Sequence, residues 1–78
     1  MIIVKLREAI AAHHLRTGEQ VTYEALAQRT GLSRATLESI ASRPSYNATL
    51  STIAAICRAL GCQPGDILEL LPDETDEH

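Results

Sequence analysis

The sequence of 78 residues contains no Phe, no Trp, only two Tyr and only two Cys. Two cysteines are too few for the disulfide framework of a small secreted domain, so an apolar core or a partner subunit must stabilise the fold. No apolar run approaches the roughly 18–20 residues that cross a bilayer. The first residues, MIIVKL, also lack the apolar stretch and the cleavage site of a signal peptide. These absences predict one cytoplasmic domain that has no membrane partner.

Positive charge is also scarce. Seven Lys and Arg residues stand against ten Asp and Glu residues, which gives a net charge of −3. Four of the acids lie in the last six residues, DETDEH, and without them seven bases stand against six acids. Phosphate neutralisation dominates the affinity of nucleic-acid-binding proteins, so a nearly neutral body argues modestly against DNA binding. A dimer that places Arg34 and Arg43 on one face would compensate.

Motifs of catalysis and metal binding are absent as well. The sequence has no glycine elbow around a nucleophilic serine, no phosphate-binding loop and no paired-histidine helix motif. His13 and His14 are adjacent, so on a helix their side chains diverge by about 100° and cannot chelate one ion together. We expect a half-buried His13 and a solvated His14. Cys57 and Cys62 are a poor zinc pair, and the sequence predicts no enzyme, no metal and no cofactor.

One stretch of twenty residues, YEALAQRTGLSRATLESIAS at positions 23–42, predicts two short helices joined by a tight corner. Gly31 suits a backbone that needs a positive φ at the end of the first helix. Ser33 can cap the second helix by accepting a hydrogen bond from a free N–H group. Leu37 and Ile40 are three residues apart and therefore point back to the first helix. This is the layout of a helix-turn-helix, whose second helix can enter the major groove of DNA.

The stretch resembles the helix-turn-helix of the lambda-repressor/Cro-like family of bacterial and phage regulators. The family has a small residue at the fifth place of the motif, glycine at the ninth, and apolar residues at the fourth, tenth, fifteenth and eighteenth. Counted from Tyr23, the fifth, ninth, fourth, tenth, fifteenth and eighteenth places hold Ala27, Gly31, Leu26, Leu32, Leu37 and Ile40. Residues 49–71 are similar to the last two helices of the family. The resemblance implies an all-α, five-helix lambda-repressor-like DNA-binding domain over residues 1–71, followed by an acidic tail at 72–78.

Caps and breakers predict the boundaries of the elements. Thr22 and Thr49 can cap helices, and Gly18 and Gly61 can end them. MIIV is apolar and β-branched, which indicates a short strand at the N-terminal end, and a second short strand is allowed at the C-terminal end. The expected helices span residues 5–16, 22–30, 33–42, 49–60 and 64–70, and the acidic segment after Pro72 is expected to be frayed. One core should hold Leu26, Leu32, Leu37, Ile40, Ile53, Ile56 and Leu60, with Ala27 at the closest helix crossing.

The second helix of the motif carries the predicted base-reading residues. By resemblance, Arg34, Ala35 and Thr36 occupy the principal base-reading places of the family, and Ser39 occupies that of the next turn. Arginine can bind guanine through two hydrogen bonds, while the methyl groups of Ala and Thr suit the methyl group of thymine. Glu38 lies on the same side, where it would either accept a hydrogen bond from cytosine N4 or repel a phosphate. A merely soluble helix face is the alternative reading of these positions.

Phosphate contacts are expected at both ends of the motif. The loop after the second helix supplies four side chains that would clamp the phosphates beside the groove: Arg43, Ser45, Tyr46 and Asn47. An alternative role for Tyr46 is to close the core, since the chain has no Phe or Trp. Tyr23 stands where the family often has a glutamine that contacts phosphate; its hydroxyl could reach a phosphate, or its ring could pack on the loop at 16–21. Ser33 stands where the family caps its recognition helix, and we include it in the predicted DNA surface.

The sequence thus predicts a small transcriptional regulator that binds double-stranded DNA sequence-specifically and acts by occupying its site. The alternative is a protein-interaction or antitoxin-like module that keeps the fold without strong DNA binding, which the neutral body and Glu38 favour. We also expect a homodimer built from the apolar chain ends, because unpaired β edges invite association. Two recognition helices about 34 Å apart would read successive major grooves of a palindrome. The alternative is a monomer whose terminal strand covers its own core.

Overall fold

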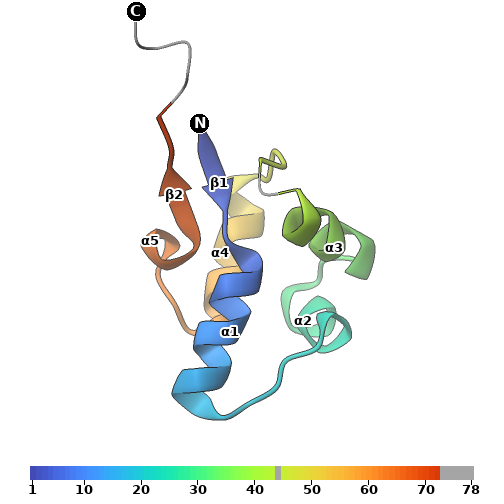
Figure 1. The fold of residues 1–78 in the computed structure, drawn as a ribbon. Coiled ribbons are helices and arrows are strands. Elements are labelled where there is room, and N and C mark those ends of the chain that lie inside the picture. Colours follow the sequence, from blue (N-terminus) through green and yellow to red (C-terminus); the bar gives the residue numbers. More distant parts are fainter. Residues whose placement is uncertain (44, 73–78) are drawn as a thin grey trace, which may run out of the picture.

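The structure is a computed structural model that describes residues 1–43 and 45–72. Its elements in chain order are β1 (Ile2–Val4), α1 (Leu6–Thr17), α2 (Tyr23–Thr30), α3 (Arg34–Ser42), α4 (Leu50–Leu60), α5 (Pro64–Ile67) and β2 (Leu68–Leu70) (Figure 1). The predicted five-helix fold with short strands at the two ends is therefore confirmed. None of the helices within the described ranges is long and apolar enough to span a membrane. The frayed tail expected after Pro72 lies outside the described residues.

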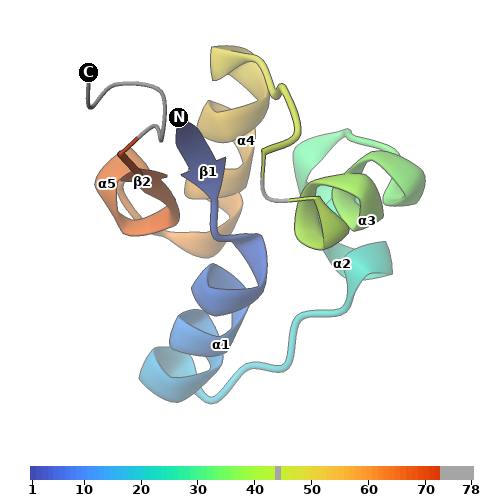
Figure 2. The ribbon, with the colours of Figure 1, turned by 45° about the horizontal axis from the view of Figure 1, so that its top comes forward.

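Helix α4 lies at the centre of the fold. It packs against α2 and α5, and α1 contacts α3, α4 and α5. Two views of the ribbon show the α2–α3 pair on one side of α1 and α4, and α5 with the strands on the opposite side (Figure 1, Figure 2). The helix-turn-helix therefore occupies one flank of the molecule, and the paired chain ends occupy the other.

Three helices begin at the hydroxyl caps that the sequence predicts. The cap oxygens of Thr22, Ser33 and Thr49 accept hydrogen bonds of 3.0–3.1 Å from the backbone N–H groups of Ala25, Thr36 and Thr52. Three glycines end α1, α2 and α4 in the left-handed conformation, namely Gly18 at φ 79°, Gly31 at φ 78° and Gly61 at φ 66°. Side chains with a Cβ rarely adopt that conformation, so these glycines set the helix ends.

The fifth helix is shorter than the sequence predicts. We expected it to run from Pro64 to about Leu70, but it ends at Ile67, and the next three residues form β2. Strand β2 pairs with β1 in antiparallel register, with Ile2 opposite Leu70. The backbone N–H of Lys5 also donates to the carbonyl of Ile67 at 2.7 Å. The prediction was wrong because these strand bonds come from the far end of the chain, which local helix signals do not report.

Apolar side chains from all five helices meet in one core. The largest fully buried side chains are Leu6, Leu26, Leu37, Ile40, Ile56, Leu60 and Ile67. Six of the seven residues expected in this core are buried, while Leu32 is half-buried and packs against it. Ala27 is also half-buried and packs on the same core. Because the chain has no Phe or Trp, branched aliphatic side chains fill the interior, where a Leu or Ile to Ala change costs about 2–5 kcal/mol.

His13 is buried rather than half-buried, which corrects the expectation, whereas His14 is exposed as expected. The Nδ1 atom of His13 lies 3.1 Å from the carbonyl oxygen of Leu60 at the end of α4, and its Nε2 atom lies 2.8 Å from Oε1 of Glu19. Glu19 also pairs with Arg29 on α2. Burial is tolerated because both ring nitrogens have polar partners. These contacts tie the loop between α1 and α2 to the helices on both sides.

Glu19 generates a prediction about acid stability. Hydrogen bonds from Arg29 and, second, from His13 lower the pKa of the Glu19 carboxyl from 4.5 to about 2. A carboxyl whose pKa is lowered by folding stabilises the protein above its unfolded pKa, and this contribution is lost as the pH falls through the folded pKa. We therefore expect Glu19→Gln to lower the melting temperature at neutral pH, and the difference to shrink as the pH falls from 4.5 to about 2. Thermal unfolding across this range measures it.

The matched control is Glu24→Gln. Glu24 is exposed on α2, and no ion pair is recorded for it in the described part of the chain. Its replacement should lower the melting temperature less than Glu19→Gln does, because Glu24 interacts only with the N-terminal end of α2. Equal losses in the two variants, or a loss for Glu19→Gln that persists in acid, would contradict the role assigned to Glu19.

Candidate nucleic-acid interface

Helix α3 presents one polar face to solvent and one apolar face to the core. Its buried residues are Leu37, Ile40 and Ala41. On the outer side Arg34, Ala35, Glu38 and Ser42 are exposed, and Thr36 and Ser39 are half-buried. The predicted base-reading residues are therefore all at least partly accessible to solvent on α3. Thr36 and Ser39 are less accessible than the other three.

The corner before α3 is braced by Thr30 as well as by Gly31. The hydroxyl of Thr30 donates to the carbonyl of Leu26 at 2.7 Å and accepts from the backbone N–H of Leu32 at 3.2 Å. Leu32 then packs against the core. These contacts hold the angle between α2 and α3, which determines how far α3 can project into a groove.

Ser33 and Thr36 share a local hydrogen-bond pair at the start of α3. The Ser33 hydroxyl accepts from the backbone N–H of Thr36 at 3.0 Å and donates to Oγ1 of Thr36 at 2.8 Å. The Ser33 hydroxyl is thus committed to the helix cap. The Thr36 hydroxyl still has its own proton to donate, and its methyl group can make an apolar contact. Of these two predicted contacts, Thr36 is the one that retains a free donor.

The loop after α3 places Arg43 against Tyr46. The guanidinium carbon of Arg43 lies 5.2 Å from the centroid of the Tyr46 ring, a cation–π distance. The backbone N–H of Tyr46 donates to the carbonyl of Arg43 at 2.7 Å, which closes a tight turn. Tyr46 is half-buried and packs against the core, which is the alternative role that the sequence suggested for it. Ser45 and Asn47 are exposed. Exposed hydrogen-bond donors on Arg43, Ser45 and Asn47 therefore follow directly after α3.

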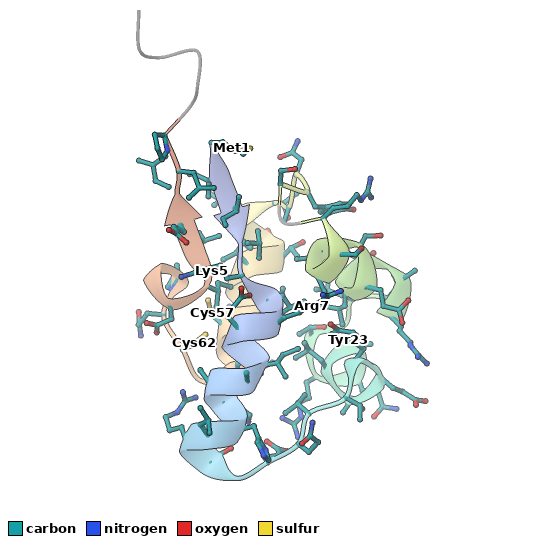
Figure 3. All side chains as sticks on the ribbon, viewed as in Figure 1. Met1, Lys5, Arg7, Tyr23, Cys57 and Cys62 are labelled. Carbon is teal, nitrogen blue, oxygen red and sulfur yellow. The ribbon has the colours of Figure 1, made fainter. Side chains whose placement is uncertain are left out.

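Tyr23 opens α2 beside a shallow hollow of about 250 Å³. The hollow is lined by Arg7 and Ile10 from α1 together with Val21, Thr22 and Tyr23. Tyr23 is half-buried and packs against the core. Figure 3 shows Arg7 on the side of α1 that faces the α2–α3 pair. Sequence analysis missed Arg7, because nothing in the local helical pattern distinguishes it from other exposed positions of α1.

A family described as the Cro/C1-type HTH DNA-binding domain matches residues 5–73. The chain belongs to this family. The resemblance inferred from the motif is therefore confirmed. A relative in Bacillus subtilis (strain 168), the uncharacterized HTH-type transcriptional regulator YozG, is 47% identical over 49 residues, which are 63% of this chain and 58% of the relative. The chain thus spans less than two thirds of the length of this relative.

The Cro/C1-type fold is also found in a solved structure, that of the restriction-modification controller protein C.AhdI from Aeromonas hydrophila. The two structures superimpose with a TM-score of 0.60 at 25% sequence identity. The match covers 81% of this chain and 91% of the controller protein. The shared fold therefore takes in most of both chains.

Several basic side chains of this Cro/C1-type domain are already bound to acidic side chains. The recorded pairs are Lys5–Glu69, Arg29–Glu19 and Arg34–Glu38, and Arg16 donates to the carbonyl of Leu60. Within residues 1–43 and 45–72, no ion pair is recorded for Arg7, Arg43 or Arg58. Arg43 caps the end of α3, Arg7 faces the α2–α3 pair, and Arg58 is exposed on α4. Two of these three cations therefore lie near the helix-turn-helix.

The two thiols lie away from this interface, at the end of α4 (Figure 3). Cys57 is buried and Cys62 is half-buried, and both are free. Burial first, and then the neighbouring Cys57, raise the pKa of Cys62 to about 11. At neutral pH Cys62 is therefore a protonated thiol, a poor nucleophile and a poor metal ligand. No group of three or more His, Cys, Asp or Glu that could hold a metal ion occurs among the residues that the structure describes.

Proposed function

We propose that this Cro/C1-type domain binds double-stranded DNA sequence-specifically and regulates transcription by occupying its site. The observation that carries the proposal is the exposed face of α3, on which Arg34, Ala35 and Thr36 surround the start of the helix while Leu37 and Ile40 anchor it in the core. The printed names of the regulator YozG and of the controller protein support a regulatory role. In this proposal α3 enters the major groove, and the protein acts in the cytoplasm without catalysing a reaction.

Phosphate contacts flank the recognition helix in this proposal. Arg43 binds the backbone at the C-terminal end of α3, and the Arg43–Tyr46 stack orients its guanidinium. On the side of α2, Arg7 and Tyr23 bind a second stretch of backbone from either edge of their hollow. A helix in the major groove lies between two phosphate backbones, so contacts on both sides fix its depth and register. This arrangement reduces the disadvantage of a nearly neutral domain.

We further propose that the protein is a homodimer. Among residues 1–43 and 45–72, five large apolar side chains are exposed, and four of them lie near the chain ends or at the start of α4: Met1, Ile2, Leu50 and Leu70. Ile2 and Leu50 both line a groove of about 330 Å³ whose other walls include the loop at 45–48, and none of the described residues that line it is charged. A second copy seated there would bury this apolar surface and place two recognition helices on one face of DNA.

Arg34→Ala tests base reading. Loss of a two-hydrogen-bond contact to guanine should weaken binding to the preferred site by about 1–3 kcal/mol and relax the preference at one base pair. The preferred site is found by selection from random duplexes, and competition titrations then give the affinities. If Arg34→Ala retained the affinity and the sequence preference of the parent, base reading by α3 would be refuted. Failure of the parent itself to bind any duplex at low salt would favour the protein-interaction alternative.

Arg7→Gln and Arg43→Gln test the two phosphate contacts. Each variant should weaken binding to all sequences alike, because phosphates carry no sequence information. Each should also lower the slope of log affinity against log salt by about 0.9, which is the contribution of one neutralised phosphate. Arg58→Gln removes the same charge from the last turn of α4, which is outside the helix-turn-helix, and should leave the slope unchanged. Equal changes in all three variants would indicate only a general effect of net charge.

Leu50→Asp tests the dimer. Leu50 is 83% exposed in the monomer and is the first residue of α4, where an acidic side chain suits the helix dipole, so the fold should persist. A charge buried in the apolar groove should convert the dimer to a monomer in sedimentation at micromolar concentration. Leu15→Lys is the control, because Leu15 is 86% exposed near the C-terminal end of α1 and does not line the groove. A parent that sediments as a monomer would refute the dimer, and dissociation by both variants would move the interface elsewhere.

A further inference from the structure

The recognition helix carries only two charged residues, and they are bound to each other. Arg34 and Glu38 are the sole charged positions in α3. Their spacing of four places them on the same side of the helix. The Nε–H group of Arg34 donates to Oε2 of Glu38 at 2.9 Å, while the two side chains remain 64% and 49% exposed. The pair therefore stands on the surface that faces DNA in the proposed function, on which this inference rests.

The contact uses only one edge of the guanidinium. Arginine has five N–H donors in a planar fork, and Glu38 takes the single donor at Nε. The terminal amino groups of Arg34 have no recorded hydrogen bond within residues 1–43 and 45–72. Paired donors at the end of the fork match O6 and N7 of guanine, which lie side by side in the major groove. Glu38 thus leaves free the part of Arg34 that suits guanine.

Fixing Arg34 before DNA arrives has an energetic consequence. A free arginine side chain samples many rotamers and loses that freedom on binding, so a pre-oriented side chain loses less. An unrestrained Arg34 at the edge of the groove could also turn to a phosphate, which would strengthen binding to every sequence alike. The carboxylate holds the guanidinium over the helix face instead. It also adds a negative charge near the backbone, which weakens non-specific binding.

We propose that Glu38 is a positioning residue: it contacts no base, holds Arg34 in the geometry that selects guanine, and gives up non-specific affinity in exchange for specificity. Repulsion against wrong sequences is a general route to discrimination, because specificity is a difference between two affinities. This assignment differs from both roles considered for Glu38 from the sequence, cytosine recognition and simple repulsion of phosphate. Each of the three roles leaves a different pattern of affinities.

Glu38→Ala separates the three roles. We measure the affinity of the full chain for its preferred duplex and for a random-sequence duplex at the same salt concentration. We expect non-specific affinity to rise, and the ratio of specific to non-specific affinity to fall by about twofold, the bias that an exposed i, i+4 ion pair supplies. Glu38→Gln keeps an acceptor oxygen without the charge and should retain part of the ratio. The melting temperature should change little, because exposed ion pairs contribute little stability.

Two further variants act as controls. Glu24→Ala removes an exposed acid from α2 without touching Arg34, so it should raise both affinities and leave their ratio unchanged. In an Arg34→Ala background, Glu38→Ala should no longer change the ratio, since the residue through which Glu38 acts is absent. Selection from random duplexes should show that Glu38→Ala relaxes the same base pair as Arg34→Ala.

Three results would overturn the inference. An unchanged ratio in Glu38→Ala would leave Glu38 with phosphate repulsion alone. A loss of cytosine preference that persisted in the Arg34→Ala background would make Glu38 a base-reading residue. If the parent bound no duplex at low salt, the proposed function would fail and this inference would fail with it, whereas the first two results leave DNA binding intact.

Discussion

Burial of the apolar face of α4 is the constraint on which the rest of the structure depends. Ile56 and Leu60 are almost completely buried, and α1, α2 and α5 all contact α4. The chain has no Phe or Trp to fill space, so a close fit of branched aliphatic side chains must stabilise the domain. Leu37 and Ile40 join the same core, and their burial turns the opposite face of α3 outward. The orientation of the recognition helix is therefore a consequence of packing.

Polar contacts hold the segments that the small apolar core does not reach. The loop between α1 and α2 has only one buried apolar residue, Val21. His13, Glu19 and Arg29 connect this loop to α1, α2 and the end of α4 through hydrogen bonds and an ion pair. At the two ends of the chain, β1 and β2 satisfy each other's backbone groups, and β2 follows α5 directly. Polar contacts therefore hold the loop that leads into the helix-turn-helix and pair the two ends of the chain.

The positions of the basic side chains in this domain matter more for DNA binding than the net charge does. Lys5 and Arg29 are paired with acids away from the exposed face of α3, whereas Arg7 and Arg43 have no recorded acidic partner in the described ranges and lie near the helix-turn-helix. A net charge of −3 therefore says little about the local field that DNA would meet, since interactions between exposed charges are screened within about 10 Å. On the recognition helix itself, the charge of Arg34 is likewise modified by a neighbour, since Glu38 pairs with it.

The sequence by itself determined the helix-turn-helix and most of the helix ends. Caps such as Ser33, breakers such as Gly31 and the spacing of Leu37 and Ile40 act within a few residues, so local chemistry specifies them. For the same reason, the candidate base-reading face of α3 could be predicted from helical periodicity once the buried side was known.

Only the tertiary structure decided the features that join distant segments. The end of α5 depends on strand pairing between Ile2 and Leu70, residues at opposite ends of the chain, and the burial of His13 depends on Leu60. Arg7 entered the candidate interface because α1 packs beside α2 and α3, which no local pattern reports. Helix caps and periodicity are properties of neighbours in the chain, whereas these contacts exist only after folding has brought remote residues together.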